Sequence, residues 1–513
     1  MSKIRIKQAI VSVSDKSNLE KLSFFFYKNN IKVLSSGGTF DFLKKINSRL
    51  MLTKIENFTK FPEILDGRVK TLHPLIHAGI LANKNSPAHL KQIKKIGLEP
   101  IDLVVTNLYP FEKISSDPKS TEAHCIENID IGGPALIRGA AKNFESVAVL
   151  TSPDQYENFI KEVEENNNCI SFESRKNLAR SAFNETAYYD SLICNWINKN
   201  EKLFEHSHSS IPLKKINKLR YGENPHQKAS VFSHGNNIVK KLSGKDLSFN
   251  NIYDLEIAIE LAEQFKLQSC VILKHGNPCG VALAEDQKKA YHKALKCDPI
   301  SAFGGIVAFN NTVTLSTAKE ILKLFTEVVV APNFESKALE FLKTKKNLIL
   351  VKYVSSGKNT SISIKSTRNF LLAQEKDVKT ISKNDITFKT RKKVNKQVLD
   401  DLIFGFIVSK FVNSNAIVLA NNLSTLGIGV GQTNRLDSAR QAIKSMKNNF
   451  KNSKAVMASD GFFPFPDIVK ICSKNNIIAI IQPGGALKDD LIVEIADKHG
   501  IPMAFTGSRH FKH

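Results

Sequence analysis

The sequence predicts an α/β protein whose first part is a doubly wound parallel sheet and whose second part is a two-lobed α/β region. Three observations predict this. Short apolar runs alternate with helical patterns through the first ~200 residues. The same alternation resumes after a polar interval. Within the second part, the segments 270–281 and 415–431 share the order apolar strand, polar turn and Gly-bearing apolar strand, which indicates two related lobes.

In the first part, apolar runs predict strands and amphipathic stretches predict helices. The predicted strands are Gln8–Val13, Ile31–Ser35, Leu103–Asn107 and Val147–Leu150, and the predicted helices are Asn18–Asn29, Thr39–Ile46, Pro87–Ile96, Pro134–Lys142 and Arg175–Lys199. Strands and helices that alternate at this spacing favour a parallel sheet. We expect a first domain over 1–199 with its core in 1–150, a polar linker over 200–218, and a second domain over 219–513.

In the second part, strand and helix patterns alternate again. They cover Ser269–Lys274, Glu285–Lys296, Gly305–Phe309, Lys319–Phe325, Val328–Ala331, Asn395–Val412, Ala416–Ala420, Ala439–Asn449, Ile477–Ile481 and Asp489–His499. Between them, Ser355–Lys393 is rich in Ser, Lys and Thr and holds one apolar run, Phe370–Ala373. We interpret this interval as a surface excursion and a poor candidate for function.

Composition argues against several classes of protein. No apolar run approaches the ~20 residues of a membrane span. The first residues lead directly into a strand pattern, so we expect no signal peptide. The seven cysteines are scattered without a C-x-x-C pair, which indicates reduced thiols in a cytoplasmic protein.

The formal net charge of +24 favours a nucleic-acid partner at first sight. However, 61 of the 73 cations are lysines spread over the whole chain, and abundant Asn and Ile accompany them, as an AT-rich codon bias would produce. We therefore interpret the charge as a solvated lysine-rich surface. A basic nucleic-acid-binding protein is the alternative, and its affinity would fall steeply with salt, but no zinc-finger, KH or RNP-type motif supports it.

Two strand ends in the first part carry residues that suit a phosphate. Ser-Val-Ser-Asp-Lys at 12–16 and Ser-Ser-Gly-Gly-Thr at 35–39 each place hydroxyls just past a strand. Such residues at a helix N-terminus form an anion cradle at the carboxyl edge of a parallel sheet. An ordinary capped turn is the alternative for either segment alone, whereas both together favour phosphate. The candidate ligands are Ser12, Ser14, Lys16, Ser36, Gly37, Gly38 and Thr39.

A dense polar run at 66–74 brings a planar cation, a point cation, a hydroxyl and an imidazole close together. It supplies Gly67, Arg68, Lys70, Thr71 and His73. These groups favour one polar, phosphorylated ligand.

The spacing of His73 and His77 also raises the alternative of metal-dependent hydrolysis. Pro74 follows the first histidine, the glutamate of a His-Glu-x-x-His motif is absent, and no third ligand is apparent. We therefore expect no metal site.

In the second part, Lys274 and His275 follow a short apolar strand and precede a turn that contains Gly, Asn and Pro. Neighbours on a turn can both face a pocket, unlike neighbours on a strand. Histidine is the natural proton shuttle near neutral pH, and lysine can stabilise an oxyanion or protonate a leaving nitrogen. A surface pair without function is the alternative, but the position of the pair favours catalysis.

The turn Lys-His-Gly-Asn-Pro-Cys-Gly at 274–280 resembles the catalytic turn of AICAR transformylase, and Arg-Tyr-Gly-Glu-Asn-Pro-His-Gln at 220–227 resembles its nucleotide-binding signature. The segments 298–305, 414–415, 431–435, 459–467 and 509–513 also match that enzyme, and 66–74, 107–111, 129–134 and 140–143 match IMP cyclohydrolase. The chain thus resembles the bifunctional AICAR transformylase/IMP cyclohydrolase family from about Ala9 to His513.

This resemblance implies a bifunctional enzyme of de novo purine biosynthesis. Such an enzyme transfers a formyl group from 10-formyltetrahydrofolate to AICAR and then closes the ring of formyl-AICAR to IMP with loss of water. The resemblance also implies a methylglyoxal-synthase-like first domain, cytidine-deaminase-like lobes in the second, and a homodimer whose transformylase sites are shared between chains. A methylglyoxal-synthase-like regulatory module is the alternative for the first domain, but it gives no role to Lys70, Tyr109 and Lys142 together.

The resemblance assigns residues to both sites. For cyclisation it implies Lys70, Tyr109, Asp130 and Lys142 as catalytic residues, with the phosphate ligands above and Arg68, Thr71, Asn107, Gly132 and Gly133 as substrate contacts. For formyl transfer it implies Lys274, His275 and Asn415 as catalytic, Arg220, Tyr221, Phe462 and Arg509 as nucleotide contacts, and Gln432, Arg435, Pro464 and Phe465 at the folate. It implies small-molecule substrates, and no metal, nucleic acid or membrane.

Overall fold

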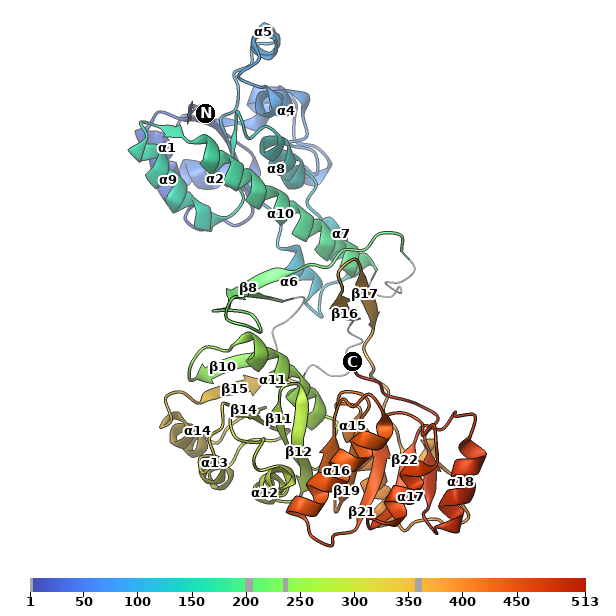
Figure 1. Cartoon of the computed structure of the whole chain (residues 1–513). Coiled ribbons are helices and arrows are strands. Elements are labelled where there is room, and N and C mark those ends of the chain that lie inside the picture. Colours follow the sequence, from blue (N-terminus) through green and yellow to red (C-terminus); the bar gives the residue numbers. More distant parts are fainter. Residues whose placement is uncertain (1–2, 199–205, 234–238, 356–361) are drawn as a thin grey trace. The chain divides into compact units, whose positions relative to one another are not determined.

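A computed structural model of the chain describes residues 3–198, 206–233, 239–355 and 362–513. The chain divides into two compact units, Met1–Lys214 and Lys215–His513 (Figure 1). Part of the expected linker lies outside the described residues, and its end, Lys214–Lys218, forms strand β8, which pairs with β9 (Ser230–Ser233). Within the described residues, no helix is both long enough and apolar enough to cross a membrane.

Unit 1 contains a five-stranded sheet in the order β4-β3-β2-β5-β6, and every pairing in it is parallel. Its strands are β2 (Gln8–Val13), β3 (Lys32–Ser35), β4 (Leu52–Lys54), β5 (Leu103–Asn107) and β6 (Ala148–Leu150). A separate short pair joins β1 (Ile4–Arg5) and β7 (Cys169–Ile170). The parallel sheet agrees with the fold that the sequence predicts.

Helices cover both faces of this sheet. Alternate residues of β2 point to opposite cores: Ala9 and Val11 pack with α1 and α9, and Ile10 packs with α4, α8 and α10. The helices are α1 (Leu19–Lys28), α2 (Gly37–Ile46), α3 (Ile55–Thr59), α4 (Pro74–Leu81), α5 (Pro87–Lys95), α6 (Phe111–Ser115), α7 (Glu122–Glu127), α8 (Gly132–Lys142), α9 (Tyr156–Glu165) and α10 (Phe172–Ile197), with 3-10 turns at Leu65–Gly67 and Pro153–Gln155. The unit is therefore doubly wound.

The strand order positions the site of unit 1. From β2, the chain continues to β3 and β4 on one side, and β5 and β6 lie on the other. Ligands of doubly wound sheets bind outside the carboxyl ends of the strands where the order reverses. In this unit that point lies at the ends of β2 and β5.

Unit 2 contains a twelve-stranded sheet in the order β10-β15-β14-β13-β11-β12-β20-β19-β21-β22-β23-β18. The order β15-β14-β13-β11-β12 is mirrored by β23-β22-β21-β19-β20, and β12 meets β20 at the centre. The first lobe comprises α11 (Phe249–Ala262), β11 (Gln268–Lys274), β12 (Asn277–Ala284), α12 (Gln287–Cys297), β13 (Ile306–Phe309), α13 (Leu315–Ile321), β14 (Val328–Ala331), α14 (Ser336–Lys343) and β15 (Ile349–Tyr353). The second lobe comprises α15 (Lys396–Ser409), β19 (Ile417–Asn421), β20 (Ser424–Gly429), α16 (Arg435–Asn449), β21 (Ala455–Ser459), α17 (Asp467–Ser473), β22 (Ile477–Gln482), α18 (Asp489–Lys498) and β23 (Met503–Phe505). The two lobes that the sequence predicts therefore share one order of elements.

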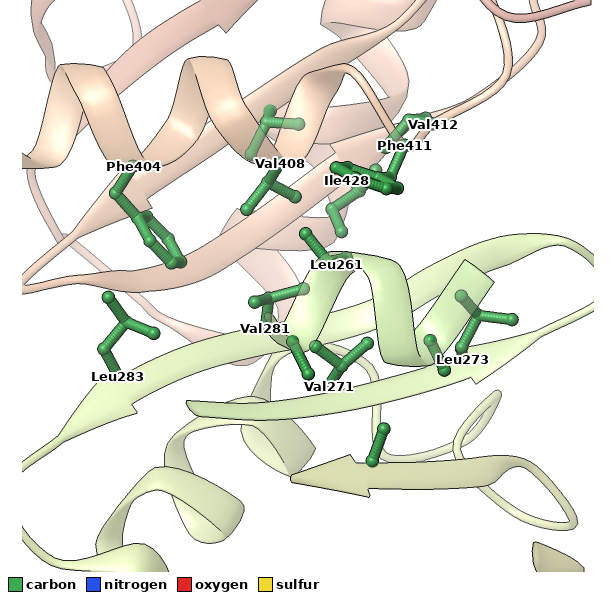
Figure 2. Packing of buried hydrophobic residues seen from close by; sticks show 14 of the residues in the cluster. Leu261, Val271, Leu273, Val281, Leu283, Phe404, Val408, Phe411, Val412 and Ile428 are labelled. Atoms are coloured by element: carbon green, nitrogen blue, oxygen red, sulfur yellow. The ribbon is translucent and has the colours of Figure 1, made fainter. Parts of the chain in front are cut away.

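One hydrophobic core joins the two lobes. Leu261 of α11 and Val281 of β12 lie close to Phe404, Val408 and other residues of the second lobe (Figure 2). Separate cores lie under α12–α14 in the first lobe and under α16–α18 in the second. Segments that precede β11 and β19 can therefore meet at the boundary between the lobes.

The remaining strands of unit 2 are β10 (Val239–Ser243), β16 (Ile362–Ser366), β17 (Leu371–Glu375) and β18 (Thr387–Phe388), with a 3-10 turn at Lys383–Asp385. The expected surface excursion thus contains a hairpin, β16–β17. Its apolar residues Phe370, Leu371 and Leu372 are 70%, 74% and 55% exposed.

Candidate functional sites

In unit 1, Asn107 connects the ends of β2 and β5. Its side-chain oxygen accepts hydrogen bonds from the backbone amides of Ser14 (2.7 Å) and Asp15 (2.8 Å), and its side-chain nitrogen donates to the Asp15 carbonyl (2.9 Å). Asn107 therefore shapes the loop that carries Ser14 and Lys16, just past Ser12 in β2, and all three residues are half-buried. Its side-chain oxygen is therefore committed to holding this loop in place.

The second phosphate segment lies at the start of α2, where the helix begins at Gly37 after Ser36. Ser36 is 5% exposed, and its hydroxyl has no hydrogen-bond partner within the part of the chain that the structure describes. A buried hydroxyl without a partner is costly, and an anion at the helix N-terminus would satisfy it. Gly37 and Gly38 leave open space where a Cβ would lie.

Thr39 does not present its hydroxyl to this cradle. The hydroxyl donates to the carbonyl of Val13 (3.0 Å) and accepts from its amide (3.2 Å), so it ties α2 to the end of β2. Thr39 can therefore offer a phosphate only its backbone amide.

The structure brings Lys70, Tyr109 and Asp130 together. Burial is the largest effect on Asp130 and raises the pKa of its carboxyl, while the Gly133 amide, the charge of Lys70 and the Tyr109 amide oppose that rise. The Gly133 amide donates to Asp130 Oδ1 at 2.8 Å. A half-buried carboxylate with a raised pKa beside a lysine is suited to proton transfer.

Two glycines at the start of α8 fit closely around this group. A Cβ on Gly133 would lie 2.4 Å from Asp130 Oδ2, and a Cβ on Gly132 would lie 2.7 Å from Thr71 Oγ1. Thr71 is buried, 2% exposed. The two glycines therefore allow the carboxyl and the hydroxyl to approach the helix N-terminus.

Lys142 and Arg68 have surroundings of their own. Lys142 is exposed at the last residue of α8, ten residues from Gly132 and about 15 Å along the helix axis. Arg68 is paired with Glu127 of α7, Nη2 to Oε2 at 2.5 Å and Nε to Oε1 at 3.4 Å.

The two histidines whose spacing raised the metal alternative, His73 and His77, have different local environments. His73 Nδ1 accepts from the Leu75 amide (3.2 Å) at the start of α4, and burial lowers the pKa of His77.

In unit 2, β11 and β12 form a hairpin whose two loop residues are His275 and Gly276. His275 is exposed and adopts a left-handed conformation with φ +54°, followed by Gly276 with φ +72°. Lys274 Nζ donates to the carbonyl of Phe303 (2.7 Å), within the 298–305 motif. Lysine and histidine therefore stand side by side at the end of the hairpin.

The segment before β19 meets this hairpin at the lobe boundary. The Asn413 amide donates to Asn277 Oδ1 (2.9 Å). Asn415 Nδ2 donates to the carbonyls of Gln432 (2.8 Å) and Thr433 (3.3 Å), so the amide of Asn415 is anchored to the loop that follows β20. Lys274, His275 and Asn415 therefore come from segments that the fold joins.

Arg220 and Tyr221 line a large hollow of about 2250 Å³. Phe511, Lys512 and His513 of the C-terminal segment line the same hollow. Lys274 and His275 do not line it, but Lys512 Nζ reaches the catalytic hairpin by donating to the Gly276 carbonyl (2.9 Å). The nucleotide-binding signature and the chain end therefore line one hollow, and the chain end also contacts the hairpin.

The residues predicted to contact folate differ in their surroundings. Arg435 is buried and paired with Asp460, and it also donates to Ser459 Oγ (3.1 Å). Gln432 Nε2 donates to the Val430 carbonyl (3.0 Å). By contrast, Pro464 and Phe465 are exposed, Phe462 is half-buried, and the exposed guanidinium of Arg509 lies 4.7 Å from the centre of the Phe511 ring.

Sequence reasoning missed three residues that support these sites. The Tyr189 hydroxyl accepts from the Asp130 amide (2.9 Å) and donates to the Asn128 carbonyl (3.2 Å). Asp254 accepts from the amides of His275 and Gly276, and Lys512 contacts the same turn. Only Lys512 lay in a segment that the resemblance marked.

Comparison with known proteins gives a consistent result over the whole chain. A family model described as "AICARFT/IMPCHase bienzyme" matches residues 140–445, and one described as "MGS-like domain" matches residues 18–135. A "Bifunctional purine biosynthesis protein PurH" from Thermoanaerobacter sp. (strain X514) is 46% identical over 512 residues, covering 99% of this chain and 100% of that protein. Proteins of the same name from Caldicellulosiruptor saccharolyticus and Persephonella marina are 45% and 42% identical over 518 and 521 residues, each covering 99% of this chain and 100% of the relative.

Proposed function

Because the chain belongs to the AICARFT/IMPCHase bienzyme family, we propose that its unit 2 carries out formyl transfer and its unit 1 carries out ring closure. The chain is a bifunctional enzyme of purine biosynthesis that formylates AICAR, with a formyl-folate as co-substrate, and cyclises the product to IMP. The observation that supports this division most strongly is the presence of one group of polar, chemically suited side chains in each unit.

In unit 1 the phosphate of formyl-AICAR binds at the ends of β2 and β3. Two features support this placement: the Ser36 hydroxyl has no hydrogen-bond partner among the described residues, and α2 begins there. The phosphate receives further contacts from Ser12, Ser14, Lys16 and the backbone at Gly37, Gly38 and Thr39.

The reacting groups then meet Lys70, Tyr109 and Asp130. The carboxamide nitrogen attacks the formyl carbon and gives one proton to Asp130, while Lys70 stabilises the oxyanion of the tetrahedral intermediate. That oxygen then takes up the proton held by Asp130 and the proton of the formamide nitrogen, and it leaves as water as the C=N bond of the ring forms. The raised pKa of Asp130 supports its role as the base. Lys142 joins this group through the resemblance alone, since it lies at the other end of α8.

Lys70→Ala and Lys142→Ala test this site when formyl-AICAR is supplied and IMP is followed. Lys70→Ala should slow cyclisation about 10²–10⁴-fold and leave formyl transfer unchanged. Cyclisation at the wild-type rate in a folded Lys70→Ala protein would overturn the assignment of the site. An equal loss in Lys142→Ala would place Lys142 in the reacting group, and full activity would remove it.

In unit 2 the amine of AICAR attacks the formyl group of the folate, which we propose to be 10-formyltetrahydrofolate. This amine is a weak nucleophile because its lone pair is delocalised into the ring and carboxamide. His275 removes its proton, Lys274 stabilises the oxyanion and protonates the leaving nitrogen, and Asn415 orients the attack. The adjacency of Lys274 and His275 at the end of one hairpin supports these roles.

The substrates are held by the surrounding segments. The nucleotide is bound by Arg220, Tyr221 and Arg509. An apolar wall faces the pterin and consists of Phe462, Pro464 and Phe465. Gln432 and Arg435 shape the loop beside Asn415. The buried pair of Arg435 with Asp460 supports a role for Arg435 in holding the apolar wall in place.

His275→Ala should nearly abolish formyl transfer, by about 10²–10⁴-fold, while cyclisation of supplied formyl-AICAR continues. Equal loss of both activities would contradict two separate sites. Formyl transfer at the wild-type rate would remove His275 from the mechanism.

We further propose a homodimer in the cytoplasm. The exposed apolar residues Phe370, Leu371 and Leu372 on the β16–β17 hairpin support a protein contact, since apolar patches of this kind mark interfaces. The seven free cysteines support a reducing compartment. Sedimentation should give a dimer, and a fully active monomer at working concentration would refute shared transformylase sites.

A further inference from the structure

The hairpin that carries His275 is held by a buried carboxylate outside it. Asp254, on the second turn of α11, is 8% exposed. Its Oδ2 accepts from the His275 amide (3.0 Å), and its Oδ1 accepts from the Gly276 amide (2.7 Å). Both oxygens are therefore committed to the two loop residues of the hairpin.

The second lobe contains the same device. Asp401 of α15 is 3% exposed and accepts from the amides of Asn422 (3.0 Å) and Leu423 (2.6 Å), the loop residues of the β19–β20 hairpin. In both lobes the aspartate lies 21 and 22 residues before the amides that it binds. The two contacts are thus equivalent under the internal repeat.

The loop conformations show what the carboxylates do. All four loop residues have positive φ: +54° and +72° for His275 and Gly276, and +49° and +53° for Asn422 and Leu423. A two-residue turn of this kind favours Asn-Gly, and a residue such as His or Leu with positive φ needs support from its surroundings. A carboxylate that accepts from both amides supplies that support.

Under the proposed function, only the turn of the first lobe carries reacting groups. Its loop begins with His275 after Lys274, whereas the equivalent positions in the second lobe are both asparagine, at 421 and 422. The second lobe therefore provides a matched control inside the same protein, with the same carboxylate contact and no proposed reacting group.

We propose that Asp254 is a positioning residue for formyl transfer, holding His275 in the left-handed conformation from which its imidazole meets the amine of the substrate. This inference rests on the proposed role of His275. Asp254 touches no reacting atom, so its effect is exerted on kcat through the histidine. Asp401 holds an equivalent turn for stability alone.

Asparagine is the appropriate replacement because it keeps the size of aspartate. Its oxygen can accept from one amide, but its NH2 group then faces the second amide as donor against donor. A displacement of about 1 Å at a reacting group costs about 10²-fold in rate. Asp254→Asn should therefore lower kcat for formyl transfer about 10²-fold with little change in KM for AICAR, and cyclisation should be unchanged.

Asp401→Asn is the matched control. It should lower the unfolding midpoint by an amount similar to Asp254→Asn, because it breaks the same two contacts, yet formyl transfer should stay within about twofold of the wild type. If both variants lost formyl transfer equally, the effect of Asp254 would be one of general stability and the proposal would be wrong.

A double-mutant cycle with His275→Ala separates this inference from the assignment of His275. If His275→Ala lowers formyl transfer to a measurable residual rate and Asp254→Asn lowers that residual rate no further, Asp254 acts through the histidine. If the two losses multiply, Asp254 acts elsewhere. If His275→Ala itself is fully active, the proposed function of the turn fails. If His275→Ala is impaired and Asp254→Asn is not, only this inference fails.

Discussion

Replacing Gly133 by alanine should damage ring closure through a contact that the structure defines. The added Cβ would lie 2.4 Å from Asp130 Oδ2 and 2.8 Å from Leu108 Cδ2, whereas ordinary contact begins near 3.4 Å. The carboxylate must therefore move by about 1 Å, and displacement of a reacting group by that much costs about 10²-fold in rate. We predict that Gly133→Ala slows cyclisation about 10²-fold.

The assay supplies formyl-AICAR and follows the appearance of IMP, and formyl transfer is measured on the same preparation. Gly139→Ala, on the same helix, is the control, since its Cβ would lie 3.5 Å from Ile80 Cγ2 and 3.7 Å from His77 Nδ1. That variant should cyclise normally and gain up to about 1 kcal/mol of stability from better helix propensity. Normal cyclisation by folded Gly133→Ala, or equal damage in Gly139→Ala, would refute the reasoning about Asp130.

Further predictions concern stability and pH. Arg175 is fully buried and donates to the carbonyls of Phe144 (2.8 Å) and Ile170 (2.8 Å). Arg175→Met should therefore lower the unfolding free energy of unit 1, measured in urea, by about 3 kcal/mol or more, and a loss below about 1 kcal/mol would contradict this. A Cβ on Gly280 would lie 2.0 Å from a backbone oxygen of α12. Gly280→Ala should therefore destabilise unit 2 by about 1–3 kcal/mol. An unchanged unfolding midpoint would contradict the close packing of β12 against α12. Burial lowers the pKa of Lys512 to about 8 from its ordinary 10.5, so between these values the unfolded chain holds a proton that the folded chain lacks. Lys512 should therefore make unfolding free energy rise with pH across that window by about 3 kcal/mol, and Lys512→Met, compared by urea titration at several pH values, should lose that rise.

The parts of the fold that the sequence predicted well are those that local pattern determines. The strands Gln8–Val13, Leu103–Asn107 and Val328–Ala331 lie where the apolar runs placed them, because each is a short run buried on both faces of a sheet. Helix α11 (Phe249–Ala262) was not predicted. It contributes to the core shared by the two lobes, and apolar residues on several of its faces weaken the helical period.

The site residues likewise divide into those that local pattern predicts and those that it does not. Short motifs placed Lys274 beside His275, and the resemblance placed Lys70 with Asp130. Local pattern could not show which polar groups support them, because such partners are distant in sequence: Asp254 lies 21 residues before His275. Periodicity tells which face of a helix is buried and does not tell which backbone amide its carboxylate will meet.

Local pattern also could not show which protein groups two of the predicted site residues contact. Arg435 is predicted at the folate, and local pattern could not show that the fold also pairs it with Asp460, 25 residues away. Thr39 is predicted at the phosphate, and local pattern could not show that its hydroxyl contacts the backbone of Val13. In each case the motif predicts a site residue, and the tertiary structure determines which protein group its side chain contacts.

The most direct test of two reactions on two units is to incubate the pure protein with AICAR and 10-formyltetrahydrofolate and to follow formyl-AICAR and IMP together. The wild type should form IMP, Lys70→Ala should accumulate formyl-AICAR, and His275→Ala should form neither product from AICAR yet still cyclise supplied formyl-AICAR. Failure of the wild type to make IMP, or loss of both steps from either single substitution in a folded protein, would contradict the account.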